Sequence, residues 1–352
     1  MVNPQTTERE VERVCADLFN GHPRALARAL SWVENEAPQA PAVLERVYGA
    51  PPCEWVIGIT GVGGAGKSTL VPHLARQMAE QGARVAVLAV DPSSPVSGGA
   101  LLGDRIRDAA GVQHPAIYFR SIASRGGQGG LATCVADLVR VAAAAGHDVV
   151  LIETVGAGQS ELGVLEVAHS VVLVGAPGLG DDVQAQKAGL MEVADVLVLN
   201  KADRPGAEDA ADSLRQALRL DERRAHFEDG LNPMAANEWA WMPPVLPTVA
   251  LSGTGVDQLH ARLTDHFDYL VRSGRLADLR RQHALRRLDT RLMQLVQQRV
   301  RQHLASMEGV SELTHALGNG GNPLTAARQL ADAVLPAPMT PASPAGQPAF
   351  MQ

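Results

Sequence analysis

Hydrophobic residues change their spacing along the chain, and the middle of the chain has a pattern of its own. Between Glu54 and Ala250, short continuous runs of Val, Ile and Leu alternate with longer amphipathic stretches. Runs of this kind are typical of parallel strands whose two faces are both covered by helices. The runs are WVIGI, RVAVLAV, DVVLIE, SVVLVG, DVLVLN and PVLPTVA. The pattern therefore predicts an α/β fold with a mostly parallel sheet.

Helical spacing replaces this pattern at both ends of the chain. Residues 9–47 carry apolar side chains at helical intervals, with a break at Gly21-His22-Pro23. After Gly255, a stripe of apolar residues marks one face of a long helix. This stripe consists of Leu285, Leu288, Leu292, Leu295 and Val296. Helical regions are therefore predicted to flank the sheet on both sides of the sequence.

These changes in pattern also predict the domain boundaries. The last segment, PAPMTPASPAGQPAF, is too rich in Pro, Ala and Ser to form a packed element, so it predicts a disordered tail. The predicted parts are an N-terminal helical unit at 1–50, an α/β domain at 51–258, a C-terminal helical region at 259–335 and the tail at 336–352.

Composition and charge disfavour several classes of function. The chain has 31 Lys and Arg against 38 Asp and Glu, and this net charge of -7 disfavours nucleic acid as the main partner. Arginines near Arg280 leave an RNA contact open, but a solvated helix face or a subunit contact is commoner. The N-terminus lacks the pattern of a signal peptide, and no stretch approaches the ~18 apolar residues of a membrane span. A cytoplasmic protein without a membrane or nucleic-acid partner is expected.

The cysteines and histidines show no metal-binding pattern. Cys15, Cys53 and Cys134 are far apart, so they predict neither a disulfide framework nor a Cys-x-x-Cys site. His260 and His266 share one predicted helix but are not spaced as a metal pair. The cysteines are expected to be reduced, buried thiols, and the histidine side chains are expected to be hydrogen-bonded or exposed.

A glycine-rich segment after the first apolar run carries the clearest chemistry. Gly-x-x-x-x-Gly-Lys-Ser between a strand and a helix is the signature of a phosphate-binding loop. Its backbone N–H groups surround the phosphates, Lys67 reaches the β and γ oxygens, and the Ser68 hydroxyl binds Mg²⁺. The predicted contacts are Gly61, Gly63, Gly64, Ala65, Gly66, Lys67, Ser68 and Thr69.

A second motif predicts which nucleotide is bound. Asn200-Lys201-Ala202-Asp203 directly follows an apolar run, at the sheet edge where ligands bind in such folds. The Asp203 carboxylate can accept both N–H groups of guanine, and adenine offers no such pair. Val249-Ala250, after the last run, is predicted to place a backbone N–H against the guanine oxygen. Together with the phosphate-binding loop, the motif predicts binding of GTP and GDP.

Acidic residues at strand ends predict a metal site and a nucleotide-sensing segment. Glu153 ends the DVVLIE run and opens Glu-Thr-Val-Gly, where most GTPases have Asp-x-x-Gly. Gly156 is predicted to offer its N–H to the γ-phosphate. Asp91 and Asp104 are further candidates for the Mg²⁺ shell, and a helix cap remains the alternative for each. Since no Gln directly follows Gly156, the residue that positions the catalytic water stays unassigned.

The set of motifs resembles the MeaB-type GTPases, the G-protein chaperones of adenosylcobalamin-dependent acyl-CoA mutases such as methylmalonyl-CoA mutase. The resemblance covers nearly the whole chain outside the tail. The motifs that carry it are Asp91-Pro92-Ser93-Ser94-Pro95, Gly98-Gly99, Leu102-Gly103-Asp104-Arg105, Ser124-Arg125-Gly126, Gly129-Gly130, Glu153-Thr154-Val155-Gly156 and Gly158-Gln159-Ser160-Glu161. It extends to the segments 21–34, 191–203 and 322–326.

The resemblance implies a function and the roles of several residues. It implies a Mg²⁺-dependent GTP hydrolase that gates cofactor loading and protects a B12-dependent mutase. It also implies a homodimer built with the C-terminal helical arm. The implied phosphate and metal residues are Lys67, Ser68, Asp91, Asp104 and Glu153, with Lys67 and Glu153 as the catalytic pair. The implied guanine-reading residues are Asn200, Lys201 and Asp203.

The chain departs from the family pattern at two places. Gly63 stands where the family's phosphate loop usually carries Pro, which implies a more flexible loop. The segment 175–187 resembles a mobile switch loop of the family but differs at 177–180. The sequence therefore leaves the identity of the partner mutase open. A mutase acting on another branched or hydroxylated acyl-CoA is an alternative to methylmalonyl-CoA mutase.

Two other functions share the phosphate-binding loop. A GTPase metallochaperone of the hydrogenase or urease type would need Cys or His ligands or a His-rich tract, and the sequence has neither. A small-molecule kinase would transfer the γ-phosphate to a substrate instead of water. The guanine motif from Asn200 to Asp203 disfavours a kinase.

Overall fold

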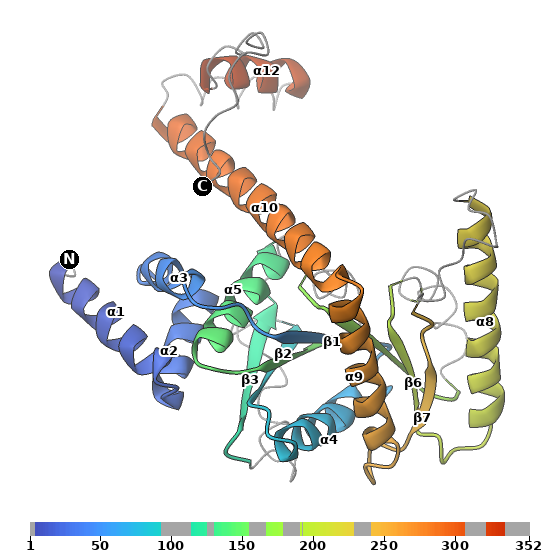
Figure 1. Ribbon diagram of the computed structural model, residues 1–352. Helices are drawn as coiled ribbons and strands as arrows, with labels where there is room; N and C mark the ends of the chain where they lie inside the picture. The colour runs from blue at the N-terminus through green and yellow to red at the C-terminus, as the bar shows by residue number, and fades with distance from the viewer. Residues whose placement is uncertain are drawn as a thin grey trace. The chain divides into compact units, whose positions relative to one another are not determined.

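The computed structural model describes residues 4–92, 114–124, 130–154, 167–178, 191, 193–228, 241–306 and 322–334. Compact packing divides the chain into two units, Met1–Arg286 and Arg287–Gln352. The first unit holds the sheet and most of the helices (Figure 1). The boundary between the units falls inside a single long helix, α10 (Arg275–Ser306).

A seven-stranded sheet forms the centre of the first unit, and each of its strand pairings is parallel. The strand order is β3-β2-β4-β1-β5-β6-β7, so β1 lies in the middle. The strands are β1 (Trp55–Gly61), β2 (Val85–Pro92), β3 (Ile117–Ser124), β4 (Val149–Thr154), β5 (Ser170–Gly175), β6 (Val196–Asn200) and β7 (Val245–Thr248). The predicted α/β class with a parallel sheet and flanking helices is confirmed.

Helices cover both faces of this sheet, as Figure 1 shows. One face packs against α4 (Lys67–Glu80) and α9 (Val256–Arg272). The other face packs against α2 (Pro23–Glu34), α3 (Ala40–Tyr48) and α5 (Gly130–Ala144). The remaining helices of this unit include α1 (Pro4–Phe19), which packs on α2, and α8 (Ala207–Glu228), which contacts β6 and β7.

Side chains along each strand alternate between these two faces, as a pleated strand requires. On β1, Ile57 and Ile59 belong to the apolar cluster beside α4 and α9. On β4, Val150 and Ile152 belong to the cluster beside α2, α3 and α5. Odd-numbered positions of β1 and β4 therefore face α4, and even-numbered positions face the N-terminal helices.

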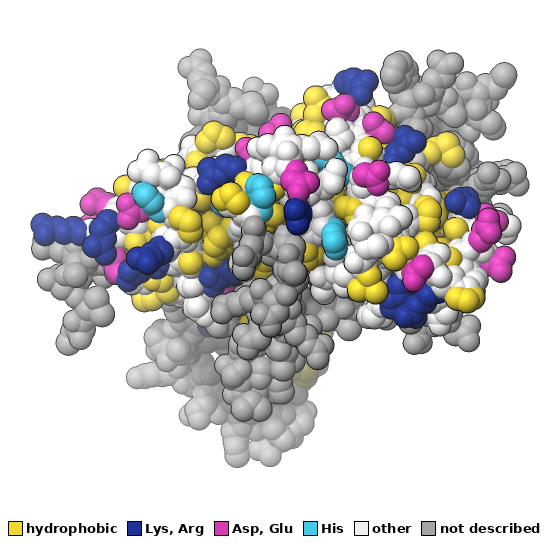
Figure 2. Space-filling model, turned by 90° about the horizontal axis from the view of Figure 1, so that it is seen from below, with side chains coloured by type: hydrophobic (Ala, Val, Ile, Leu, Met, Phe, Trp, Pro, Cys, Tyr) yellow, Lys and Arg dark blue, Asp and Glu magenta, His cyan; other side chains and the backbone are white. Residues whose placement is uncertain are grey.

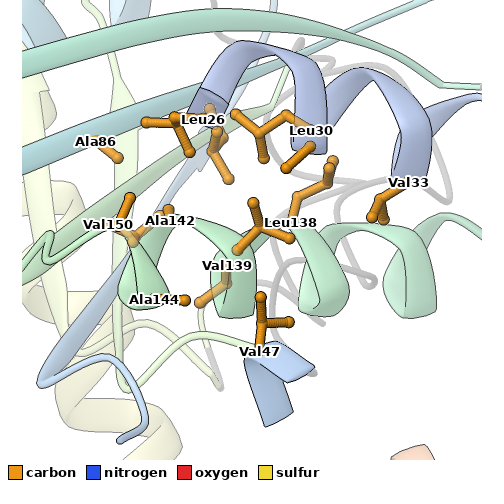
Figure 3. Packing of buried hydrophobic residues seen from close by; sticks show 14 of the residues in the cluster. Leu26, Leu30, Val33, Val47, Ala86, Leu138, Val139, Ala142, Ala144 and Val150 are labelled. Atoms are coloured by element: carbon orange, nitrogen blue, oxygen red, sulfur yellow. The ribbon is translucent and has the colours of Figure 1, made fainter. Parts of the chain in front are cut away.

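The N-terminal helices share one hydrophobic core with the sheet. Leu26 and Leu30 of α2 lie against Leu138 of α5, with Val47 of α3 nearby (Figure 3). Leu30 and Leu138 are both fully buried. The helical segment before residue 50 therefore contributes part of the core of the α/β unit.

Two arginines, one partly buried and one buried, fix the N-terminal helices to the sheet side of this core. Arg120 of β3 forms an ion pair with Glu34 at the end of α2, and the same carboxylate accepts the backbone N–H of Ala123. Arg140 of α5 donates to the carbonyl oxygens of three residues at and after the end of α3. Such bonds satisfy carbonyl groups that a helix end leaves without partners.

The second unit includes the rest of α10 and α12 (Pro323–Val334). On α10, the side chains of Leu288, Leu292, Met293 and Leu295 are each half exposed or more. The predicted apolar stripe is therefore present on the helix and exposed. None of the helices in the described ranges combines the length and hydropathy of a membrane span.

Candidate functional site

The glycine-rich loop joins the end of β1 to the start of α4, as the sequence predicts. Gly64 and Gly66 have φ angles of 76° and 94°, in the left-handed region that favours glycine. A Cβ on Gly66 would also collide with the side-chain amide of Asn200. A Cβ on Gly63 would meet nothing within 4 Å. Backbone geometry therefore requires glycine at position 66 and leaves position 63 open to other residues.

Lys67 begins α4 and folds back over the loop. Its Nζ donates to the carbonyl oxygens of Gly61 at 2.6 Å and Val62 at 3.0 Å, and the side chain is buried. A buried ammonium is strongly disfavoured unless oxygen atoms surround it. These contacts hold the positive charge at the mouth of the loop, where phosphate oxygens would bind.

The side chain of Ser68, in the first turn of α4, contacts the side chain of Glu153, near the end of β4. The Ser68 hydroxyl donates to Oε1 of Glu153 at 2.5 Å, and Glu153 is buried at the end of β4. A hydroxyl and a carboxylate oxygen in contact are the hard oxygen ligands that Mg²⁺ prefers. This pair therefore fits the predicted metal site, although among the described residues no group of three or more His, Cys, Asp and Glu converges.

Asn200 at the end of β6 ties three segments together. Its Nδ2 donates to the carbonyl oxygen of Ala65 at 2.8 Å. Its Oδ1 accepts the backbone N–H of Ala250 at 2.9 Å and the hydroxyl of Thr248 at 3.2 Å. Asn200 is buried, and in the structure it connects the phosphate loop to the loop after β7. Its predicted role as a guanine reader stays a prediction.

The next residues of this motif lie beside the glycine-rich loop and the end of β7. Lys201 has a φ angle of 60°, which is uncommon for a residue with a side chain, and its Nζ donates to the carbonyl oxygen of Gly64 at 2.6 Å. The N–H of Ala202 donates to Thr248 O at 3.0 Å. Asp203 follows on the exposed surface of the turn. The structure thus brings the phosphate loop and the guanine motif together.

The backbone of Val249 and Ala250 is engaged within the loop. The N–H of Val249 donates to Thr254 O at 3.0 Å, and that of Ala250 donates to Asn200. Both groups hold the loop beside Asn200. The contact of this pair with the guanine oxygen stays a prediction.

Several predicted site residues lie outside the described residues. These are Asp104 and Gly156, with most of the segment 175–187. Asp91 is described only as backbone in β2, in register with Ala123 of β3. The predicted metal roles of Asp91 and Asp104 and the γ-phosphate contact of Gly156 stay predictions.

Sequence reasoning missed the role of Thr248. It ends β7 in register with Asn200, and its hydroxyl donates to the Asn200 side chain. The available signal was a hydroxyl residue at the end of an apolar run. The contact with Asn200 could be inferred from that signal only once the pairing of β6 with β7 was known.

The side of the molecule seen in Figure 2 carries mixed charge. Acidic and basic side chains are interspersed there among hydrophobic ones, without a continuous basic area over the described residues. A single-sign basic surface is what binding to a phosphate backbone requires. The expected absence of a nucleic-acid partner stays a prediction.

A parallel sheet, a phosphate-binding loop between β1 and α4, and an Asn-Lys-x-Asp motif tied to that loop define a P-loop GTPase. Comparison with known families agrees. Residues 26–308 match the family model described as methylmalonyl Co-A mutase-associated GTPase MeaB. The chain belongs to the MeaB family, and the predicted GTP hydrolase activity with GTP and GDP binding is confirmed at the level of the family.

Individual relatives also match over most of the chain. GTPase ArgK of Escherichia coli is 35% identical over 289 residues, which span 81% of this chain and 83% of that protein. The mitochondrial methylmalonic aciduria type A homolog of Mus musculus is 31% identical over 320 residues, 87% of this chain and 74% of that protein. Among solved structures, a LAO/AO transport system kinase is 27% identical with a TM-score of 0.65, covering 95% of this chain and 99% of that chain.

Proposed function

We propose that this GTPase is a nucleotide-driven chaperone of a B12-dependent acyl-CoA mutase, gating cofactor loading and protecting the mutase. The observation that carries the proposal is the match over residues 26–308 to a family described as associated with methylmalonyl Co-A mutase. The mutase is methylmalonyl-CoA mutase or one that acts on a related branched or hydroxylated acyl-CoA.

The positions of the described residues support the hydrolytic roles proposed for them. Lys67 places a buried positive charge at the loop that surrounds the β and γ phosphates. Ser68 and Glu153 would hold Mg²⁺, which would neutralise charge on the phosphate oxygens when bound. The exposed Asp203 would select guanine by accepting two N–H groups.

Slow hydrolysis by the protein alone is part of the proposal. Ala157, and not Gln, follows Gly156 in the sequence. A GTPase without a water-positioning group at this place compensates poorly for charge on the γ-phosphate. A bound mutase would complete or order the site, acting through the segments 153–159 and 175–187.

A homodimer formed through α10 is also proposed. Four apolar side chains lie on one stretch of this helix, and Leu288, Leu292 and Leu295 are 65%, 55% and 58% exposed. Their spacing of four and three residues is the spacing of a helix–helix seam. Exposed apolar seams of this kind are covered by a partner in solution.

Single-turnover GTP hydrolysis tests the chaperone proposal. The rate is measured alone and with each candidate B12-dependent mutase from the same organism, alongside the mutase affinity of the GTP and GDP forms. An increased rate, together with different affinities of the two forms, supports the proposal. Lys67→Ala, which should bind nucleotide weakly, is the control for contaminating GTPase.

The outcomes separate the alternatives. If no mutase binds in any nucleotide state, the chaperone role fails while the GTPase assignment stands. Phosphate transfer to a small molecule, detected by product analysis, would show a kinase. Nickel binding at stoichiometric levels would show a metallochaperone.

A further inference from the structure

Two buried hydroxyl groups are in contact on the face of the sheet that packs against α2, α3 and α5, opposite to the face that packs against α4. The Thr154 hydroxyl donates to Oγ1 of Thr60 at 3.1 Å and lies 3.4 Å from the carbonyl oxygen of Ile59. Both threonine side chains are fully buried. They lie on β4 and β1, which pair directly in the middle of the sheet.

Packing alone does not account for hydroxyl groups at these positions. The preceding positions of β4 on the same face are Val150 and Ile152, which are both fully buried and apolar. Valine has the shape of threonine, and burial of a hydroxyl disfavours folding unless that group is hydrogen-bonded. A valine pair would fill the same space without that requirement.

Each threonine is next in sequence to a residue of the nucleotide site. Thr60 precedes Gly61, the first residue of the phosphate loop, and Thr154 follows Glu153. Alternation of side chains places Glu153 on the α4 face, where it accepts the Ser68 hydroxyl, and Thr154 on the opposite face. The end of β4 is therefore held from both faces, by Ser68 on one and by Thr60 on the other.

We propose that Thr154 is a positioning residue for GTP hydrolysis. Its hydroxyl fixes the backbone at the end of β4 to β1. This bond holds the Glu153 carboxylate within hydrogen-bond distance of the Ser68 hydroxyl. The inference rests on the metal site proposed for Ser68 and Glu153, and its experiment includes a measurement that does not depend on metal.

The first measurement is hydrogen exchange of the nucleotide-free protein, followed in peptides that cover residues 149–154. Thr154→Val should speed exchange in these peptides, because the strand end loses its tie to β1. Thr154→Ser keeps the hydroxyl and should restore the wild-type pattern. Ser170→Ala is the matched control, since it removes another fully buried, hydrogen-bonded hydroxyl from the start of β5.

The second measurement is the Mg²⁺ dependence of GDP release and of GTP hydrolysis. Thr154→Val should require more Mg²⁺ to slow GDP release and should lower kcat about tenfold, with little change in KM, because a displaced carboxylate orients the phosphates poorly. Thr154→Ser should again behave as wild type. The double variant Thr60→Val/Thr154→Val should have the same kcat and Mg²⁺ dependence as Thr154→Val, because the two substitutions remove the same hydrogen bond.

Wild-type exchange and wild-type Mg²⁺ dependence in Thr154→Val would overturn the inference. So would a Thr154→Ser variant as impaired as Thr154→Val, since side-chain size and not the hydroxyl would then matter. If hydrolysis by the wild type proves independent of Mg²⁺, the proposed metal site fails separately, and faster exchange in Thr154→Val alone would still support the positioning of the strand end.

Discussion

Asn200 and Ala65 are joined by a hydrogen bond of 2.8 Å between the side-chain amide of one and the carbonyl oxygen of the other. The bond connects the end of β6 to the phosphate loop, so the guanine motif and the phosphate loop cannot move independently. Asn200 also accepts the N–H of Ala250 and the hydroxyl of Thr248. One buried side chain thus fixes the three segments that surround the predicted nucleotide.

Substitution of Asn200 should weaken the binding of GTP and of GDP to a similar extent. Asn200→Ala leaves the groups of Ala65, Ala250 and Thr248 without their partner, at a cost of about 1–3 kcal/mol for each group that stays buried. Calorimetric titration should show reduced affinity for GTP and GDP alike, with a lower thermal midpoint. Asp203→Asn, at an exposed position, should keep the midpoint and shift preference toward xanthosine nucleotides. An unchanged midpoint in Asn200→Ala would contradict the clamp.

Two glycines of the phosphate loop should respond in opposite ways to alanine. Gly66→Ala strains a φ angle of 94° and places a methyl group against Asn200, so nucleotide binding should be lost. Gly63→Ala has open space and should raise the unfolding free energy by about 0.4–1 kcal/mol by restricting the unfolded chain. Chemical denaturation and GDP titration measure both effects. Comparable losses in the two variants would show that the loop needs glycine at both positions.

Removal of the Glu153 carboxylate should have a larger effect on the rate of GTP hydrolysis than on the affinity for GDP. Glu153→Ala deletes the partner of Ser68, and a loss of at least tenfold in turnover corresponds to roughly 1.4 kcal/mol in the barrier. Glu80→Ala, at an exposed ion pair on the same side of the sheet, is the control. Turnover is measured at saturating GTP and Mg²⁺. Wild-type turnover in Glu153→Ala would remove this residue from the active site.

Acid should destabilise the fold through two buried histidines. Burial lowers the pKa of His147 and of His260 below the usual value of about 6.5. Since the unfolded chain then binds protons more readily, the stabilising contribution is complete above about pH 6.5 and is lost as pH falls through the lowered pKa. Thermal midpoints between pH 7 and pH 5 should therefore fall, and His260→Leu should flatten this slope. His22→Gln, at an exposed position, should leave it unchanged.

Charge placed in the apolar stripe of α10 should disrupt self-association. Leu288→Glu with Leu292→Glu puts two carboxylates at exposed positions of the proposed seam. Sedimentation or light scattering should then show a monomer where the wild type is a dimer. Gln297→Glu adds charge to the same helix at another exposed position and should leave the dimer intact. A wild-type chain that is monomeric at all concentrations would exclude the proposed dimer.

Local patterns in the sequence predicted the elements of the fold and the outline of the site. The apolar runs became strands, and the glycine-rich loop lies between β1 and α4 because glycine spacing and helix start are encoded within a few residues. The Asn-Lys-x-Asp motif lies at the strand end where it was expected. These features depend on neighbours in sequence, which is why sequence reasoning finds them.

Partners that are distant in sequence could not be predicted in the same way. The contacts of Asn200 with Ala65, Ala250 and Thr248 were not predicted, and its expected role in reading guanine stays a prediction. The choice among possible partners depends on strand order, and strand order depends on packing of the whole sheet. The hydroxyl pair on β1 and β4 was missed for the same reason. The shared core of the N-terminal helices with α5 likewise follows from tertiary packing and not from their own periodicity.

The central position of β1 has a consequence for the newly made chain. Its neighbours in the sheet are β4, which pairs residue 55 with residue 149, and β5, which pairs residue 57 with residue 170. The clamp at Asn200 also needs Thr248 and Ala250. At roughly 5–20 residues per second, synthesis from the phosphate loop to that loop takes about 10–40 s. The phosphate loop is made early but cannot be held in its final form until the ribosome has delivered the last strand, so nucleotide binding begins late in synthesis.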